Sequence, residues 1–256
     1  MIIRILLRKI SLVIAEAALE TVPKKIMDHP SVRNYSKKIG KRPTETLLDR
    51  SYHHAAMLHP SLKLSSRRGR PDLIHISLLE ALSTPLFFEG LLKVYVHTIN
   101  DKVIFIGENL RLPKSYFRFE GLMMTLFKNN IIKRACSDRN DKDIMLLQLR
   151  DGITFEALIK EFVKPDKLVG LSSIGIQSTA EKVVATTLAG YENDNSFNVA
   201  FVIGGFPRGH FSDKVSKLFD KLYSVGVFKL ESHLVIARIL YECEKAFFIN
   251  DKVHQP

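Results

Sequence analysis

Short apolar runs alternate along this chain with amphipathic stretches. Two of the runs, at residues 10–15 and 198–203, are continuous and are bounded by polar residues or glycine. Such runs are typical of strands that are covered on both faces, as in parallel sheets. Residues 92–97 instead alternate with a period of two, and a further run at 103–106 follows a polar turn. This pair predicts an antiparallel hairpin with one solvated face.

Helical periodicity marks two later segments. One predicts an amphipathic helix because its apolar residues repeat at i, i+3, i+4, i+7 and i+8, namely Phe119, Leu122, Met123, Leu126 and Phe127. Pro113 lies where that helix can begin. Residues 233–248 are apolar almost all round, which predicts a helix buried in the core or in a dimer interface. The basic, polar stretches 35–43 and 65–71 are expected to be loops.

The order of these elements predicts an α/β fold, and we expect one domain over residues 1–256 with an inserted hairpin. A length of 256 residues and a hydrophobic content of 46% are enough to bury the core of such a domain.

The charge balance points to the class of partner. Thirty-eight Lys and Arg against twenty-seven Asp and Glu give a formal charge of +11. Such a field attracts polyanions, so nucleic acid is the favoured partner. An anionic membrane surface and a generally basic host proteome are the alternatives. No stretch is long and apolar enough to span a bilayer, so a membrane protein is not expected.

The beginning of the chain and its cysteines bear on the compartment. Residues 1–20 resemble a secretory signal, but their apolar run is short and Glu16 interrupts it. Cys136 and Cys243 lie far apart and outside any paired-ligand spacing, so neither a disulfide framework nor a zinc site is expected. A cytoplasmic location fits this cysteine usage.

The densest basic signal is the segment 67–72, Arg-Arg-Gly-Arg-Pro-Asp. Three arginines held by a glycine and a proline predict a stiff positive loop, and guanidinium groups suit phosphates and base edges. Asp72 is placed to accept from Arg70 and fix its orientation. The alternative is a solvated loop with a local ion pair.

A second basic cluster consists of Arg111, Lys114 and Arg118. If the helix begins at Pro113, Lys114 and Arg118 stand one turn apart on one face. The interleaved aromatic residues 116 and 117 can stack on unpaired bases. The alternative is the ordinary charged face of an amphipathic helix.

The segment 203–209, Ile-Gly-Gly-Phe-Pro-Arg-Gly, follows an expected buried strand directly. Glycines at the carboxyl end of a buried strand let the backbone approach a ligand. The spacing matches neither a dinucleotide fingerprint nor a P-loop, so a ligand contact and a plain tight turn both stay open. The three histidines at 53, 54 and 59 have no metal-ligand spacing, and there is no serine nucleophile motif.

Taken in order, five segments of the chain resemble the ribosome-biogenesis pseudouridine N1-methyltransferases, a family of the SPOUT class of knotted methyltransferases. They are LLDRSYHHAAM at 47–57, GRPDLIHISLLEAL at 69–82, LLKVYVHT at 91–98, RLPKSYFRFEGLM at 111–123 and IGGFPRG at 203–209. The resemblance runs from about residue 10 to 248, and LLDRSYHH is more similar to the archaeal branch than to the eukaryotic one. It implies a SPOUT-type parallel sheet with a C-terminal trefoil knot, a family-specific insertion at about 43–130, and a knot and cofactor region at about 168–250.

The resemblance also implies roles for residues. Arg70 contacts the substrate RNA and Asp72 steadies it, so these two are the candidate catalytic residues. RNA is further bound by Arg111, Lys114 and Arg118, although Lys114 stands where many relatives carry arginine. The cofactor is S-adenosylmethionine, and its candidate contacts are Ile176, Gly204, Gly209, Val225, Gly226, Val227, Phe228, Lys229 and Leu230.

The implied function is methylation of N1 of a pseudouridine in small-subunit (16S-type) rRNA, with a role in small ribosomal subunit biogenesis. The implied partners are that rRNA, a second copy in a homodimer, and ribosomal proteins or assembly factors. No residue stands out as a general base, and the target nucleotide has to be unstacked first. Two other functions remain open, a non-catalytic RNA-binding ribosome assembly factor and a SPOUT methyltransferase that acts on another RNA.

Overall fold

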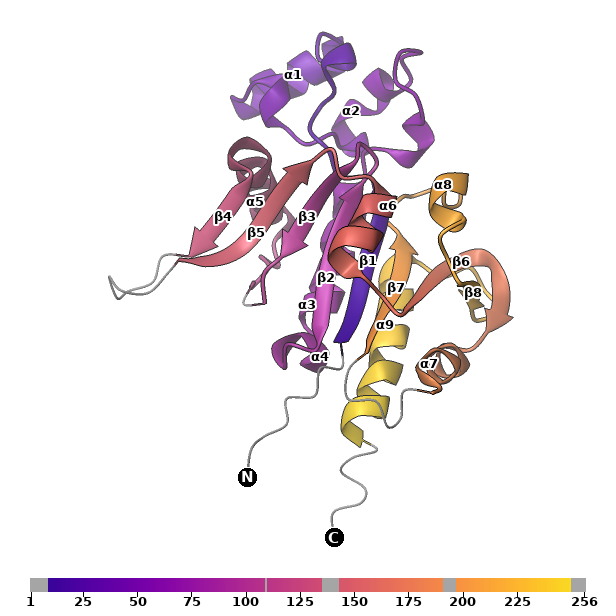
Figure 1. Ribbon diagram of the computed structural model, residues 1–256. Coiled ribbons are helices and arrows are strands. Elements are labelled where there is room, and N and C mark those ends of the chain that lie inside the picture. Colours follow the sequence, from indigo (N-terminus) through magenta and orange to yellow (C-terminus); the bar gives the residue numbers. More distant parts are fainter. Residues whose placement is uncertain (1–8, 109, 135–142, 191–196, 250–256) are drawn as a thin grey trace.

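The computed structural model describes residues 9–108, 110–134, 143–190 and 197–249, which form a sheet between two layers of helices (Figure 1). Its strands lie in the order β4-β5-β3-β2-β1-β7-β6-β8. They are β1 (Lys9–Ala17), β2 (Leu92–Thr98), β3 (Lys102–Ile106), β4 (Ile131–Arg134), β5 (Ile144–Asp151), β6 (Lys167–Ser178), β7 (Asn198–Gly204) and β8 (Lys221–Val225). The strands β2, β1, β7, β6 and β8 pair in parallel with one another in this order. On the other side, β3 pairs antiparallel with β2 and with β5, and β5 pairs antiparallel with β4.

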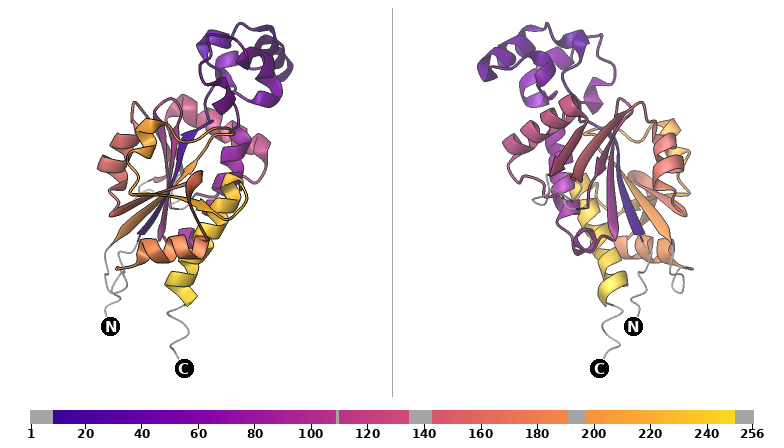
Figure 2. Two further views of the ribbon diagram at one scale, coloured as in Figure 1. Left: turned by 90° about the vertical axis from the view of Figure 1, so that its right-hand side faces the viewer. Right: turned by 60° about the vertical axis from the view of Figure 1, so that its left-hand side comes forward.

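The helices cover both faces of the sheet (Figure 2). They are α1 (Pro30–Ile39), α2 (Arg50–Met57), α3 (Pro71–Leu82), α4 (Pro85–Phe88), α5 (Tyr116–Asn129), α6 (Phe155–Ala157), α7 (Ala180–Leu188), α8 (Asp213–Ser216) and α9 (Ser232–Glu244). Helices α3, α4, α5, α7 and α9 pack on one face. A smaller core on the other face contains residues of α6, of the π-helical turn Leu158–Val163 and of α8. Helices α1 and α2 lie beyond the end of the sheet and have a small core of their own.

The expected strands are confirmed. The run at 10–15 lies inside β1 and the run at 198–203 inside β7, and the two strands pair in parallel at the centre of the sheet. Nearly every residue of both strands is buried, as continuous apolar runs predict. The expected hairpin is β2 and β3, with Val96 opposite Ile104, but the expected solvated face was wrong for β2, where six of seven residues are buried because helices cover both faces of the sheet. Sequence patterns did not predict β4 and β5, which extend the antiparallel side of the sheet.

Two expected boundaries were wrong. Residues 35–43 do not form a continuous loop, because α1 covers the first five of them. Pro30 opens this helix at its first turn, the His29 side chain accepts from Ser31 N–H, and Gly40 ends it with a φ of 65°. The helix expected from Pro113 is α5, and it begins at Tyr116.

Helix α9 is buried on one face within the chain, so the expected helix is confirmed, and burial of its other face in a dimer interface stays a prediction. Ile236, Ile239 and Leu240 are fully buried, whereas Leu234 is 43% and Tyr241 is 56% exposed. A helix can be apolar on two faces and still pack on one, which leaves the second face free for a partner. Among the described residues, no helix has both the length and the apolar character needed to cross a membrane.

Candidate active site

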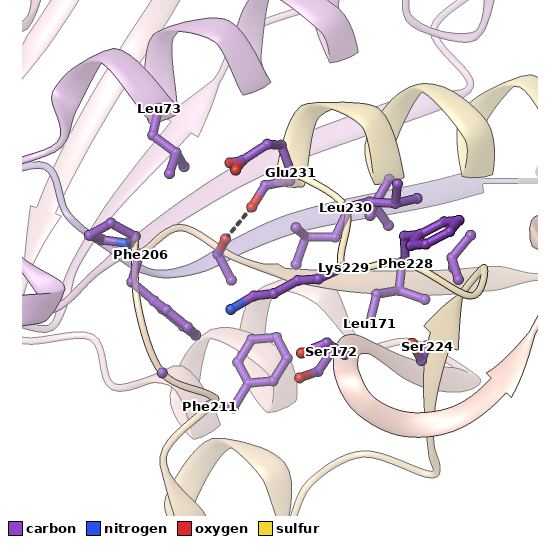
Figure 3. A pocket seen from close by; sticks show the side chains of 18 residues that line it. Leu73, Leu171, Ser172, Phe206, Phe211, Ser224, Phe228, Lys229, Leu230 and Glu231 are labelled. Carbon is purple, nitrogen blue, oxygen red and sulfur yellow. Dashed lines mark hydrogen bonds between the residues drawn. The ribbon is translucent and has the colours of Figure 1, made fainter.

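A cavity of about 300 Å³ lies at the carboxyl ends of β6, β7 and β8 (Figure 3). Its walls come from residues 171–173 of β6, the turn at 204–211 that follows β7, and residues 228–232 that lead into α9. Leu73 of α3 closes the remaining side. The carboxyl ends of parallel strands are the usual place for a ligand in an open α/β sheet.

The two glycines at the start of the turn after β7, Gly204 and Gly205, are each approached closely by a neighbouring residue. A Cβ on Gly204 would lie 2.7 Å from the ring of Phe206, which lines the cavity. A Cβ on Gly205 would lie 2.7 Å from the Cα of Ala17 at the end of β1. The turn is also tied to the start of α9, because the Ser232 hydroxyl donates to the Gly204 carbonyl over 2.9 Å. The cavity wall is therefore built from two segments that fix one another.

An irregularity in β6 shapes the opposite wall. Its register with β8 shifts between Leu171 and Ile176, and the intervening residues bulge out of the ladder. The bulge brings Ser172 and Ser173 to the cavity. Ile176 lies beyond it and is 62% exposed. Sequence reasoning identified Ile176 and missed the two serines, because the bulge has no local signature.

The structure brings most of the candidate cofactor residues together. Six of the nine line the cavity, namely Gly204, Gly209, Val225, Phe228, Lys229 and Leu230. Ile176, Gly226 and Val227 lie outside the lining. Gly226 has a φ of 88° and turns the chain away from the strand, so Val227 is 80% exposed. Phe206, which stands inside the glycine segment, is a lining residue that sequence reasoning passed over.

Two opposite charges face the cavity. The amine of Lys229 points into it toward Phe211, and the carboxylate of Glu231 lies on the side of Leu73 (Figure 3). The rest of the lining is largely apolar or hydroxyl-bearing. The cavity thus suits a ligand that has an apolar ring and carries both a carboxylate and an ammonium group.

Arg70 and Asp72 form a forked ion pair beside this cavity. Arg70 Nε lies 2.8 Å from Asp72 Oδ1, and Arg70 Nη2 lies 2.8 Å from Oδ2. Their side chains are 39% and 40% exposed. The hydrogen bond to Asp72 raises the pKa of Arg70, and the charge of Glu231 acts in the same direction, so the guanidinium stays charged. Because Leu73 follows Asp72 and lines the cavity, the pair lies at its edge.

The other two arginines of the segment 67–72 do not belong to a free positive loop, so that expectation was wrong. Arg67 pairs with Glu16 over 2.9 Å, and both side chains are at most 13% exposed. Arg68 pairs with Glu20 over 2.6 Å and is equally covered. Both acids come from the end of β1 and the residues after it, far away in sequence. Of the three arginines, Arg70 is therefore the one that a ligand can reach most readily.

The second basic cluster is exposed, as expected. Arg111, Lys114 and Arg118 all lie at the surface, but Lys114 precedes α5 instead of standing within its first turn. The hydroxyl of Tyr116 donates to Asp49 over 2.6 Å, which engages that ring in a contact inside the protein. Phe117 is 77% exposed and remains open to a stacking partner.

The fold and cavity define a three-layer α/β protein with a ligand site at the carboxyl ends of its strands, and comparisons give its family. A family model described as EMG1/NEP1 methyltransferase matches residues 12–244. The chain is 40% identical over 212 residues to "Ribosomal RNA small subunit methyltransferase Nep1" of Thermococcus onnurineus, covering 83% of this chain and 89% of the relative. The relative of the same name from Staphylothermus marinus is 35% identical over 240 residues, covering 94% and 97%.

Among solved structures, the chain is similar to a crystal structure of Archaeoglobus fulgidus Nep1 bound to S-adenosylhomocysteine. That match has a TM-score of 0.75 and 33% sequence identity, and it covers 93% of this chain and 98% of the other. The chain belongs to the EMG1/NEP1 methyltransferase family.

Proposed function

We propose that this protein methylates N1 of a pseudouridine in small-subunit rRNA with S-adenosylmethionine as cofactor, and that it acts in the biogenesis of the small ribosomal subunit. The observation that carries the proposal is the junction at the start of α3. Asp72 there pairs with Arg70, and Leu73, the next residue, lines the cavity. A cofactor site and an arginine suited to RNA therefore share one turn of helix.

The cavity fits this cofactor on its chemistry. Apolar and aromatic residues such as Leu171, Phe206 and Phe228 suit the adenosine part. Lys229 and Glu231 carry the charges that complement the carboxylate and the ammonium group of the amino-acid part. When bound, the cofactor supplies a methyl group on a sulfonium sulfur. The Archaeoglobus structure, which is bound to the demethylated cofactor S-adenosylhomocysteine, supports the same assignment.

The residues outside the cavity hold and orient the RNA. Pseudouridine is joined to ribose through carbon, so its N1 carries a proton that is lost when N1 gains the methyl group. Arg70 carries its charge at the edge of the cavity, where it favours the deprotonated base electrostatically. Asp72 fixes the guanidinium in one orientation, and correct alignment of the reacting nitrogen contributes much of the rate. We assign phosphate contacts to the exposed Arg111, Lys114 and Arg118.

A homodimer belongs to this proposal. Exposed apolar side chains lie in and after the bulge of β6, on the turn after the edge strand β8 and at the start of α9, namely Ile174, Ile176, Val227, Phe228 and Leu234. An apolar patch of this kind marks an association surface. We further propose that residues 1–256 form one SPOUT-type domain in the cytoplasm, with the insertion at about 43–130 and the trefoil knot within about 168–250.

The proposal is tested with two transcripts of the same 16S-type rRNA segment, which differ only in carrying uridine or pseudouridine at the same positions. Calorimetry with S-adenosylmethionine measures cofactor binding, and mass mapping locates any methyl group. We expect methylation of the pseudouridine transcript only, because N1 of uridine is blocked by its glycosidic bond. Tight RNA binding without methyl transfer would indicate a non-catalytic assembly factor. Methylation of transfer RNA or of a ribose hydroxyl would overturn the proposed target.

A further inference from the structure

Helix α2 carries an exposed tyrosine that the proposed function leaves without a role. The ring of Tyr52 stacks on that of Tyr35 from α1, with ring centres 4.1 Å apart and planes 15° from parallel. His53, which is fully buried, meets the ring of Tyr35 edge-on. Tyr52 itself is 47% exposed. A flat aromatic ring is thus held in one orientation at the surface of α1 and α2, which together form the helical unit.

The apolar core between the two helices does not include this ring, whose contact across them is the stack on Tyr35. The small core of the unit contains Val32 of α1 with Ala56 and Met57 of α2, and each of these is at most 1% exposed. Tyr52 lies outside that core. Stacking on Tyr35 buries part of the Tyr52 side chain, and the 47% that remains exposed is not used in the core of the protein.

The surface near the tyrosine pair carries charges of both signs, with the carboxylates of Glu120 and Asp49 near Tyr35 and three lysines at the end of the same helix. Lys37 and Lys38 occupy the last turn of α1, and Lys41 follows the helix. All three lysines are exposed, and within the described part of the chain none of them forms an ion pair. Unpaired lysines beside an aromatic platform are the combination by which proteins hold single-stranded nucleic acid, with cations on the backbone and a ring under a base.

This surface continues into the second basic cluster. Asp49, which caps α2, accepts the hydrogen bond from Tyr116 at the start of α5. Burial raises the pKa of Glu120 on α5, and the nearby charge of Lys41 opposes that rise, which places the end of α1 against the same helix. Arg118 lies on α5 as well. A strand of RNA that contacts Arg118 can therefore extend over the helical unit.

We propose that Tyr52 is a binding site for an unpaired base of the substrate RNA, distinct from the target nucleotide, with Tyr35 as its support and the lysines of the α1 end as phosphate contacts. The inference rests on the proposed function for the identity of the RNA as rRNA. A peptide partner is disfavoured because the described residues around the ring form no continuous exposed apolar patch. The exposed apolar side chains near it on α2 and the following residues are single ones, Leu58 and Leu64.

The first test compares Tyr52→Leu with Phe88→Leu. Phe88 is 71% exposed on α4, at the opposite end of the molecule, and serves as the matched control (Figure 1). We expect Tyr52→Leu to weaken binding of a 16S-type rRNA transcript about fivefold to a hundredfold, the range for one base stacked on an aromatic ring. Tyr52→Phe should restore binding, and Phe88→Leu should have no effect. Cofactor affinity, measured alongside, should stay at the parental value, and a melting curve accounts for the stacking contact with Tyr35 that Tyr52→Leu removes.

Salt dependence separates stacking from charge. Tyr52→Leu should leave the slope of log affinity against log salt unchanged, whereas Lys41→Gln should flatten it by about one phosphate contact. The chain contains no tryptophan, so Tyr52→Trp creates a single fluorescent reporter at the site. Its emission should change on addition of oligoadenylate but not of a duplex RNA of equal length. No change with either, or parental affinity in Tyr52→Leu, overturns the inference.

The outcomes also separate this site from the proposed function. A protein that methylates no rRNA, but loses RNA affinity with Tyr52→Leu, refutes the proposed activity and keeps the stacking site. A protein that methylates rRNA normally, with parental RNA affinity in Tyr52→Leu, keeps the activity and refutes the site.

Discussion

The guanidinium carbon of Arg67 lies 4.0 Å from the ring centre of Phe206. Arg67 precedes the Arg70–Asp72 pair, and Phe206 lines the cavity, so this contact joins the two halves of the candidate site. Glu16 holds the Arg67 side chain in this contact, because it accepts a hydrogen bond from Arg67 over 2.9 Å and another from the backbone N–H of Ser212 over 3.0 Å. Three segments that are far apart in sequence thus meet at one buried ion pair.

Replacement of Arg67 tests whether its contacts with Phe206 and Glu16 shape the cavity. Arg67→Met keeps the aliphatic stem of the side chain but leaves the buried Glu16 without its charged partner, which should cost about 3 kcal/mol of folding free energy. The loss of support under Phe206 should also weaken S-adenosylmethionine binding. Thermal melts and calorimetry measure both effects. Arg33→Met is the control, because its pair with Asp28 is exposed and should matter little. A folded Arg67→Met protein with parental cofactor affinity would exclude the coupling.

The two glycines after β7 give a matched pair of substitutions. Gly204→Ala drives its Cβ into the movable ring of Phe206, so we expect weaker cofactor binding with a loss of about 1–3 kcal/mol, the usual cost of overpacking. Gly205→Ala meets the backbone of Ala17 instead, which cannot move aside, and should chiefly lower the melting temperature. The reverse pattern, with Gly205→Ala affecting only the cofactor, would show that the turn is placed incorrectly.

Asp72→Ala separates positioning from simple attraction. A carboxylate repels phosphate, so its removal should tighten RNA binding if the site is only an electrostatic clamp. If Asp72 orients Arg70, RNA binding should instead weaken by roughly 1 kcal/mol, about fivefold, because the pair is two-fifths exposed. Methylation should fall at least as much. Filter binding and a methyl-transfer assay decide between the two signs, and a melting curve accounts for any loss of stability at the start of α3.

The central strands and the hairpin were predictable because their information is local. The continuous apolar runs of β1 and β7 and the period of two in β2 appear directly in the sequence, although β2 is in fact buried on both faces. The end of a buried strand followed by glycines likewise predicted where a ligand could lie, and Gly204 lines the cavity as expected. These features depend on a few neighbouring residues and are visible without tertiary contacts.

The state of the arginines was not predictable, because their partners are distant. Arg67 and Arg68 are neutralised by Glu16 and Glu20, which stand 51 and 48 residues earlier. Glu16 reaches Arg67 from a left-handed backbone conformation with a φ of 51°, which no sequence rule assigns to glutamate. Long-range pairing of this kind decides which arginine of a basic segment remains open to RNA.

Stability should fall as the pH drops below about 6.5, the ordinary pKa of histidine. Burial lowers the pKa of His53 and His97 in the folded state, so in this range the unfolded chain binds more protons and acid favours it. The variant His53→Asn keeps an acceptor for the N–H of Asp49 and removes one titrating group. Its melting temperature should therefore vary less between pH 7.5 and 5.5, roughly the window around that pKa. Buried carboxyls such as Glu120 act in the opposite direction in both proteins, so the comparison isolates His53. Equal slopes would contradict the assignment.

Ile176 is the residue through which the homodimer is best tested. It is 62% exposed on β6 opposite Tyr223 of the edge strand, and the turn with Val227 and Phe228 lies directly after that strand. In a dimer through this patch, Ile176→Asp buries a charge without a partner, which should raise the dimer Kd about a hundredfold, the effect of roughly 3 kcal/mol. Phe88→Asp, in α4 at the amino end of β2, should leave the dimer intact. Because Phe228 also lines the cavity, separated subunits should bind S-adenosylmethionine more weakly than the parent. Sedimentation at micromolar concentration measures the association. A parent protein that is monomeric there would exclude the dimer, and an Ile176→Asp variant that stays dimeric would place the interface elsewhere.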